Sequence, residues 1–235
     1  MSWFETWFDD DYLALYSHRN SAEAALNLPL LEQYLPATSR VLDIACGAAR
    51  YSSLLASRGF DVIGIDLSWS LLQVARKTVD TPVSFLRADM RALPFANETF
   101  GAALSLFNSF GYLESDLAHR SMLLEWRRVL TPHAPLLIDY FERDALIAGL
   151  ERHSVVSTGD STFHIERSLS VDGLRIEKRV AIQRPDRPDR HILESVRLYT
   201  PREIGELLQS SGFILRHELA GLGPNQRLFV AEAFA

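Results

Sequence analysis

The residues best placed to bind a ligand lie between Val41 and Arg50, in the run VLDIACGAAR. Apolar residues open this run as a buried strand, small residues follow, and a helical pattern begins at Arg50. Such a turn presents free backbone N–H groups and the positive end of a helix dipole to a polar or anionic ligand. The next apolar run ends at Asp66, whose carboxylate could accept hydrogen bonds from a ribose diol.

Two protein families bind a ligand with a strand, a tight turn and a helix N-terminus of this kind, and the positions of the glycines distinguish them. A dinucleotide-binding turn carries G-x-G-x-x-G, whereas here Gly47 stands alone among alanines. The run instead resembles motif I of the class I S-adenosylmethionine (SAM) dependent methyltransferases, acid-x-G-x-G-x-G, with Asp43 as the acid and Gly47 as the middle glycine. Ala45 and Ala49 replace the outer glycines, which is tolerable at negative φ but costs roughly 1 kcal/mol or more at positive φ.

The resemblance covers about residues 40–139, and more loosely residue 199 to the end. It implies SAM as the cofactor and S-adenosylhomocysteine as its product. Carried over by position, it implies these contacts: Asp43 with the methionine amino group, the backbone of Ala45 and Gly47 with the cofactor, Asp66 with the ribose, Leu67 and Met90 with the adenine ring, Asp89 with the adenine amino group, and Phe107 and Asn108 with the sulfonium and the substrate. Each residue also has a structural interpretation, as a cap, a turn or a strand end, but their order at successive strand ends favours the cofactor.

The N-terminal segment, residues 1–36, is expected to be helical. Acids precede Tyr12, and Ser21 precedes a second amphipathic run that Pro36 ends. Because the resembling family often closes its cofactor site from the N-terminus, Tyr12, Tyr16 and Arg19 are candidate lid residues. The alternative is a surface helix with half-buried tyrosines.

Methyl transfer from a sulfonium is an in-line displacement, which needs alignment and exclusion of water. A proton acceptor helps when the nucleophile arrives protonated. The catalytic residue is left open, with Asn108, Tyr112 and His18 as candidates. Tyr140 and three further histidines (His153, His164 and His191) are additional candidates for the proton acceptor, and the sequence does not rank them. No metal is expected, because Asp139 has no evident acidic partner and Cys46 is the single cysteine.

Strand and helix patterns alternate from residue 41 to residue 140 and predict an α/β fold. We expect a Rossmann-like, mainly parallel seven-stranded sheet whose last strand is antiparallel, in one methyltransferase domain over residues 1–235. The alternation stops over residues 142–200, where three strand-like runs predict an antiparallel β insertion that acts as a substrate lid. A capping box at Thr200 then opens a helix, and a hairpin over residues 213–234 closes the fold.

The composition narrows the class of function. The 235 residues carry a net charge of −6 and no uninterrupted basic block, which argues against a nucleic-acid partner. No signal peptide or membrane span is recognised, so a cytoplasmic protein without a membrane partner is expected.

The sequence therefore predicts a SAM-dependent methyltransferase acting on a small-molecule N or O nucleophile. The N-P-P-Y and Pro-Cys runs of nucleic-acid and protein methyltransferases are absent. Two alternatives stay open: an oxidoreductase with a nicotinamide cofactor, and a non-catalytic module that keeps the fold.

Overall fold

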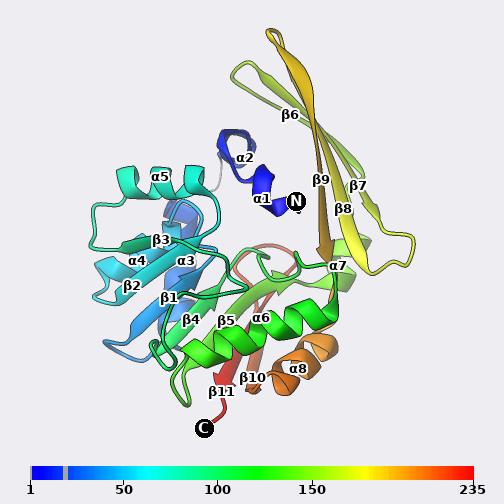
Figure 1. Ribbon diagram of the computed structural model, residues 1–235. Coiled ribbons are helices and arrows are strands. Elements are labelled where there is room, and N and C mark those ends of the chain that lie inside the picture. The colour runs from blue at the N-terminus through cyan, green and yellow to red at the C-terminus, as the bar shows by residue number, and fades with distance from the viewer. Residues whose placement is uncertain (1, 18–20) are drawn as a thin grey trace.

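A seven-stranded sheet organises the fold (Figure 1), in a computed structural model that describes residues 2–17 and 21–235. The strand order is β10-β11-β5-β4-β1-β2-β3, and β11 alone runs antiparallel to its neighbours. The strands are β1 (Arg40–Ile44), β2 (Asp61–Asp66), β3 (Ser84–Arg87), β4 (Ala102–Ser105), β5 (Pro135–Phe141), β10 (Phe213–Ala220) and β11 (Gln226–Ala233). The expected sheet is therefore confirmed, including its antiparallel last strand.

Helices cover both faces of this sheet, because its central strands are apolar on both sides. One apolar cluster joins it to α6 (Asp116–Val129) and α8 (Pro201–Ser210), and another joins it to α3 (Ser21–Glu32) and α4 (Arg50–Ser57). The capping box predicted at Thr200 is present at the start of α8. Helix α5 (Trp69–Thr78) begins at Ser68, whose side chain accepts from the Leu71 N–H.

The insertion forms a separate antiparallel sheet of four strands in the order β6-β7-β8-β9, preceded by the short helix α7 (Arg143–Ala148). Its strands are β6 (His153–Thr158), β7 (Ser161–Leu169), β8 (Arg175–Arg184) and β9 (Arg187–Arg197). The sequence predicted three strands in the insertion, and β6 is a fourth that it did not predict. Strand β6 lies at the edge of the sheet and most of its side chains are exposed, so its sequence shows little alternation of apolar and polar residues.

The N-terminal helices α1 (Phe4–Trp7) and α2 (Asp10–Leu15) pack on the insertion. Trp7 and Leu15 are buried against four apolar side chains of β7 and β8: Phe163, Ile165, Val180 and Ile182. Ion pairs surround this contact. Arg190 reaches Asp9 and Asp11 at 2.6 and 2.7 Å, and Arg184 also pairs with Asp11.

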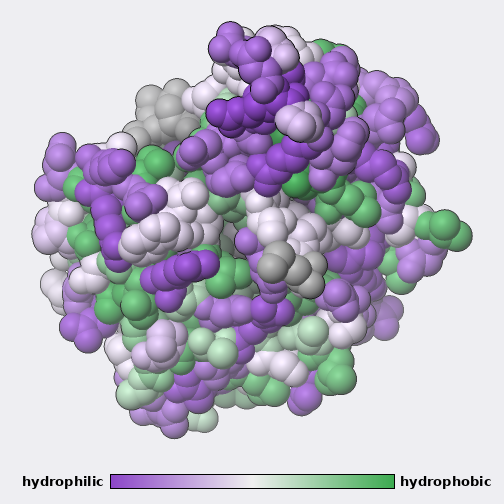
Figure 2. Space-filling model, turned by 45° about the horizontal axis from the view of Figure 1, so that its top comes forward, coloured by the Kyte–Doolittle hydropathy of each residue, from purple (hydrophilic) through white to green (hydrophobic). Residues whose placement is uncertain are grey.

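Strand β4 ends at Ser105, shortly before Phe107 and Asn108. These two residues take left-handed conformations that cannot continue a strand. Within the described ranges, every helix is too short or too polar to span a bilayer. Hydrophilic residues dominate the upper part of the surface in Figure 2, where the insertion projects.

The ion pairs predict a specific loosening of the N-terminal helices. The double variant Asp9→Asn, Asp11→Asn replaces the acidic partners of Arg184 and Arg190. Each ion pair that is lost is worth about 1 kcal/mol. We expect amides of α2 to exchange roughly five- to thirtyfold faster, with little change in the melting temperature. Hydrogen exchange followed by mass spectrometry measures this, and high salt should narrow the difference.

The matched control is Asp10→Asn, because Asp10 lies between the two acids but is exposed. Equal exchange in the control and in the double variant would show that the apolar contact alone holds the helices in place.

Candidate functional site

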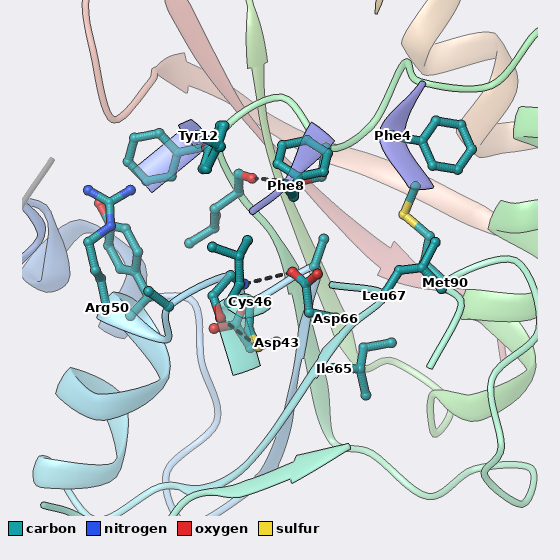
Figure 3. Close-up of a pocket in the computed structure, with 18 of the residues that line it drawn as sticks. Phe4, Phe8, Tyr12, Asp43, Cys46, Arg50, Ile65, Asp66, Leu67 and Met90 are labelled. Carbon is teal, nitrogen blue, oxygen red and sulfur yellow. Dashed lines mark hydrogen bonds between the residues drawn. The ribbon is translucent and has the colours of Figure 1, made fainter. Parts of the chain in front are cut away.

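A cavity of about 360 Å³ opens at the carboxyl ends of β1 to β4, beneath α1 and α2 (Figure 3). This is the edge at which parallel α/β sheets bind ligands. Its floor carries Asp43, Cys46 and Asp66, and Leu67 and Met90 lie opposite Tyr12 and Arg50. The other lining residues that matter below are Phe4, Phe8, Tyr16, Ala45, Gly47, Tyr51, Asp89, Phe107, Ser109 and Tyr112.

The turn after β1 has a left-handed backbone at every second residue. The φ angles of Ala45, Gly47 and Ala49 are 56°, 58° and 64°. These three positions match the three glycines of the motif, so the two alanines take the conformation that favours glycine. The sequence left the sign of these angles open, and the structure places both alanines in the costly region.

Asp66 sits at the end of β2 with only 8% of its surface exposed. Its two carboxylate oxygens accept from the N–H groups of Gly47 and Ser68, both at 2.8 Å. Burial raises the pKa of this carboxyl, and the two backbone hydrogen bonds oppose that rise. Because a carboxylate has about four lone-pair sites, it can accept further bonds from a ligand.

Asp43 is buried below the turn, where Ser52 donates a hydrogen bond of 2.5 Å to its carboxylate. Burial raises the pKa of Asp43 to about 6, against the opposing effect of the Ser52 hydrogen bond. A positively charged ligand group beside this carboxylate would favour its ionised form.

Asp89 and Met90 follow β3 and line the far side of the cavity. The Arg91 guanidinium binds both oxygens of Asp89, with Nη2 to Oδ2 at 2.6 Å. Burial would raise the pKa of Asp89, but the hydrogen bonds and charge of Arg91 outweigh it and lower that pKa. The backbone is fixed as well, because the Trp126 indole donates to the Met90 carbonyl at 3.0 Å.

The loop after β4 contains two consecutive left-handed residues, Phe107 and Asn108, a costly conformation that is concentrated at functional sites. Asp139 holds it, accepting from the Phe107 N–H at 3.2 Å and from the Leu222 N–H at 3.0 Å. Phe107 lines the cavity, whereas Asn108 is buried behind it, and its Oδ1 has no hydrogen-bond partner among the described residues.

Four aromatic residues spaced by four cover the cavity, and we call them the roof: Phe4, Phe8, Tyr12 and Tyr16. Tyr112 meets the roof from below, nearly parallel to Phe4 and Phe8 at ring distances of 6.0 and 5.8 Å. Tyr12 and Tyr16 were predicted, while Phe4 and Phe8 were missed. Their regular spacing was the signal that could have found them.

Arg50 is a further lining residue that the sequence analysis missed. It is the first residue of α4, and its guanidinium lies 4.6 Å from the centre of the Phe107 ring. A carboxylate oxygen of Glu23 lies 3.7 Å from Nη1 of Arg50. A cation beside the turn adds to the pull of the helix N-terminus on an anionic group.

The remaining candidates divide into three groups. His18 and Arg19 lie outside the described residues. Tyr140 is fully buried and donates to the Arg197 carbonyl, so it supports the fold rather than the cavity. The other three lie on the insertion and do not line this cavity: His153, His164 and His191. Among the described residues, no cluster of three or more His, Cys, Asp or Glu side chains could hold a metal ion.

Comparisons with known proteins agree with this geometry. A family described as "Methyltransferase domain" matches residues 41–133. This range contains the turn after β1 and three acids of the cavity, Asp43, Asp66 and Asp89. The match bears out, over these residues, the resemblance to the class I SAM-dependent methyltransferases.

Individual methyltransferases are similar to this chain over alignments of different length. The putative methyltransferase YqeM of Bacillus subtilis is 37% identical over 111 residues, 46% of this chain and 45% of that protein. The chain thus spans about half the length of the first curated relatives that it matches.

Two similarities extend through the insertion. An N,N-dimethyltransferase of dTDP-3-amino-3,6-dideoxy-alpha-D-glucopyranose from Streptomyces fradiae is 26% identical over 216 residues, 89% of this chain and 82% of that protein. The SAM-bound structure of CalS10, an amino pentose methyltransferase from Micromonospora echinaspora, has a TM-score of 0.72 at 21% identity. It covers 95% of this chain and 97% of that one, which shows the shared fold.

The left-handed alanines of this methyltransferase turn give a stability prediction. Ala45→Gly and Ala49→Gly each relieve about 1–2 kcal/mol of left-handed strain and each cost about 0.5–1 kcal/mol of chain entropy. We expect a net gain of up to about 1 kcal/mol, or roughly 2–4 °C in melting temperature.

Ala48 is the matched control, because its φ is not positive. Ala48→Gly should lose about 0.5–1 kcal/mol. A loss of similar size in all three variants, measured by calorimetry, would contradict the strain argument.

Proposed function

We propose that this protein transfers a methyl group from SAM to a nitrogen or oxygen of a small molecule. The observation that carries the proposal is the meeting of four strand ends in one cavity: Asp43 near the end of β1, Asp66 at the end of β2, Asp89 after β3 and Phe107 after β4. The chemistry of these groups fits the parts of SAM in order. A buried acid suits the ammonium, an acid with free lone pairs suits the ribose, and apolar residues with a third acid suit the adenine.

The residues have separate tasks in this proposal. Asp43 accepts from the amino group, Asp66 from the ribose hydroxyls, and Leu67 and Met90 pack on the adenine. The cofactor supplies an electrophilic methyl group on a sulfonium. The roof and Tyr112 exclude water from that group, and the loop at Phe107 holds the acceptor in line with it.

The acceptor is more specifically proposed to be an amine on a small molecule. Two of the relatives whose similarity runs through most of the chain carry names that state N-methylation, of an amino sugar in one case and of glycine and sarcosine in the other. An amine that arrives as an ammonium must first lose a proton, to solvent or to a carboxylate that lines the cavity.

Ligand binding tests the proposal. SAM and S-adenosylhomocysteine at about 100 times their dissociation constants should stabilise the protein by roughly 2.7 kcal/mol. That corresponds to about 5–10 °C in melting temperature for a chain of this size. NAD and NADP should give no shift, and a shift with either would favour the oxidoreductase alternative.

Methyl transfer is then measured with labelled SAM and a panel of amino sugars, amino acids and alcohols. Cofactor binding without transfer to any of them would support the non-catalytic alternative.

The pKa of Asp43 gives a pH prediction. The ammonium of the cofactor needs an ionised Asp43, but with a pKa of about 6 this group is mostly neutral at pH 5. Affinity for S-adenosylhomocysteine should therefore rise by up to about tenfold per pH unit below 6 and level off above it.

Two variants check the cause by calorimetry at several pH values. Asp43→Asn should flatten the profile at low affinity. Ser52→Ala removes a hydrogen bond that lowers the pKa, so its midpoint should move to higher pH. A midpoint that stays in place in Ser52→Ala would assign the profile to another group.

A further inference from the structure

The chain makes the same small turn where β2 ends and again just after β3. In the first turn, Asp66 Oδ1 accepts from the Ser68 N–H at 2.8 Å. In the second, Asp89 Oδ1 accepts from the Arg91 N–H, also at 2.8 Å. The turns lie side by side, because the Ala88 N–H donates to the Asp66 carbonyl at 3.1 Å. In both turns, therefore, a carboxylate of the cavity fixes the residue two positions after it.

Ser68 connects the first turn to the roof. Its hydroxyl oxygen accepts from the Leu71 N–H at 3.1 Å and so caps α5, while its hydrogen is donated to the Phe8 carbonyl. Capping needs only the acceptor, which an aspartate would supply equally well. The bond to Phe8 is a further contact, and it ends at a residue that lines the cavity.

Arg91 connects the second turn to the roof. Its guanidinium holds both oxygens of Asp89, and Nη2 also lies 3.6 Å from Oε1 of Glu5 in α1. The guanidinium carbon lies 5.4 Å from the centre of the Phe4 ring. The Arg91 side chain is 41% exposed, and exposed ion pairs add little to the stability of a fold. Stability alone therefore gives little reason for this arrangement.

A single helix can meet both turns because the spacings agree. Neighbouring strands lie about 4.8 Å apart, and one turn of an α-helix advances about 5.4 Å. Phe4 and Phe8 are one helical turn apart, and Phe4 lies by Arg91 while Phe8 lies by Ser68. Figure 3 shows both rings across the cavity from Asp66. Helix α1 is thus attached to two neighbouring strand ends, each of which carries an acid of the cavity.

We infer that Ser68 and Arg91 are positioning residues, which couple ligand binding at the two acids to the docking of α1 over the ligand. This inference rests on the proposed function, in which these acids accept from the ribose and the adenine of the cofactor. A ligand that donates to a carboxylate fixes its orientation, and the same carboxylate holds the residue that reaches the roof. Each event thereby lowers the conformational entropy that the other must lose, so the two favour one another.

The experiment measures the affinity for S-adenosylhomocysteine by calorimetry, and the hydrogen exchange of residues 4–9 with and without this ligand by mass spectrometry. The first variant is Ser68→Gly, because glycine is an acceptable N-cap but has no hydroxyl. We expect the affinity to fall by about fivefold, the effect of one hydrogen bond. The protection from exchange that the ligand gives to residues 4–9 should shrink by the same factor, because coupling between two events is reciprocal.

Glu5→Gln tests the second turn and leaves the contacts between Asp89 and Arg91 in place. Both the affinity and the ligand-dependent protection should fall by about two- to threefold, because this contact is longer and partly exposed. Ser68→Thr keeps a hydroxyl that can accept and donate, so it should bind and exchange like the unmodified protein.

The matched controls alter the same kinds of contact away from the cavity. Ser115→Gly changes the serine cap of α6, and Glu206→Gln weakens an exposed ion pair with Arg202 on α8. Neither Ser115 nor Glu206 lines the cavity, so both variants should leave the affinity and the protection unchanged.

A contact that only holds α1 in place would give a different result. Ser68→Gly and Glu5→Gln would then speed the exchange of residues 4–9 by the same factor in the free and the bound protein, with unchanged affinity. That outcome would overturn the inference and leave the proposed function standing. Absence of S-adenosylhomocysteine binding to the unmodified protein would overturn both.

Discussion

The geometry of the cavity depends on one buried carboxylate, that of Asp66. By accepting from the Gly47 and Ser68 N–H groups, it joins the turn after β1 to the start of α5. Ser68 in turn donates from its hydroxyl to the Phe8 carbonyl, at the roof. A short chain of hydrogen bonds thus links the floor of the cavity to its cover. The group proposed to hold the ribose is also the group that holds the site together.

The floor of the site could be predicted from the sequence because it is built from strand ends. Asp43, Asp66 and Met90 each follow an apolar run, and parallel strands bring their carboxyl ends to one edge. The pattern that identifies the strand therefore also places the residue. The conformation of Ala45 and Ala49 could not be decided in this way, because alanine by itself favours negative φ and only the closed turn imposes the positive values.

The cover of the site was harder to predict, because its contacts join distant parts of the chain. Trp7 packs on β7 and β8, whereas the roof residues near it line the cavity, and Tyr16 also contacts Lys178 of β8. Nothing near residue 16 in sequence indicates a partner at residue 178. Arg50 was missed for a different reason, since one arginine at a helix start is usually a solvated residue.

The contact between the N-terminal helices and the insertion also constrains the order in which the protein can assemble. Asp9 and Asp11 are synthesised before Arg184 and Arg190, and Arg184 lies 173 residues after Asp11. Closing a loop of that length carries an entropy cost that only the finished insertion can offset. During synthesis the sheet can therefore form while Phe4, Phe8 and both N-terminal tryptophans are still without their partners. For that interval these aromatic side chains are exposed and are open to chaperones and to aggregation.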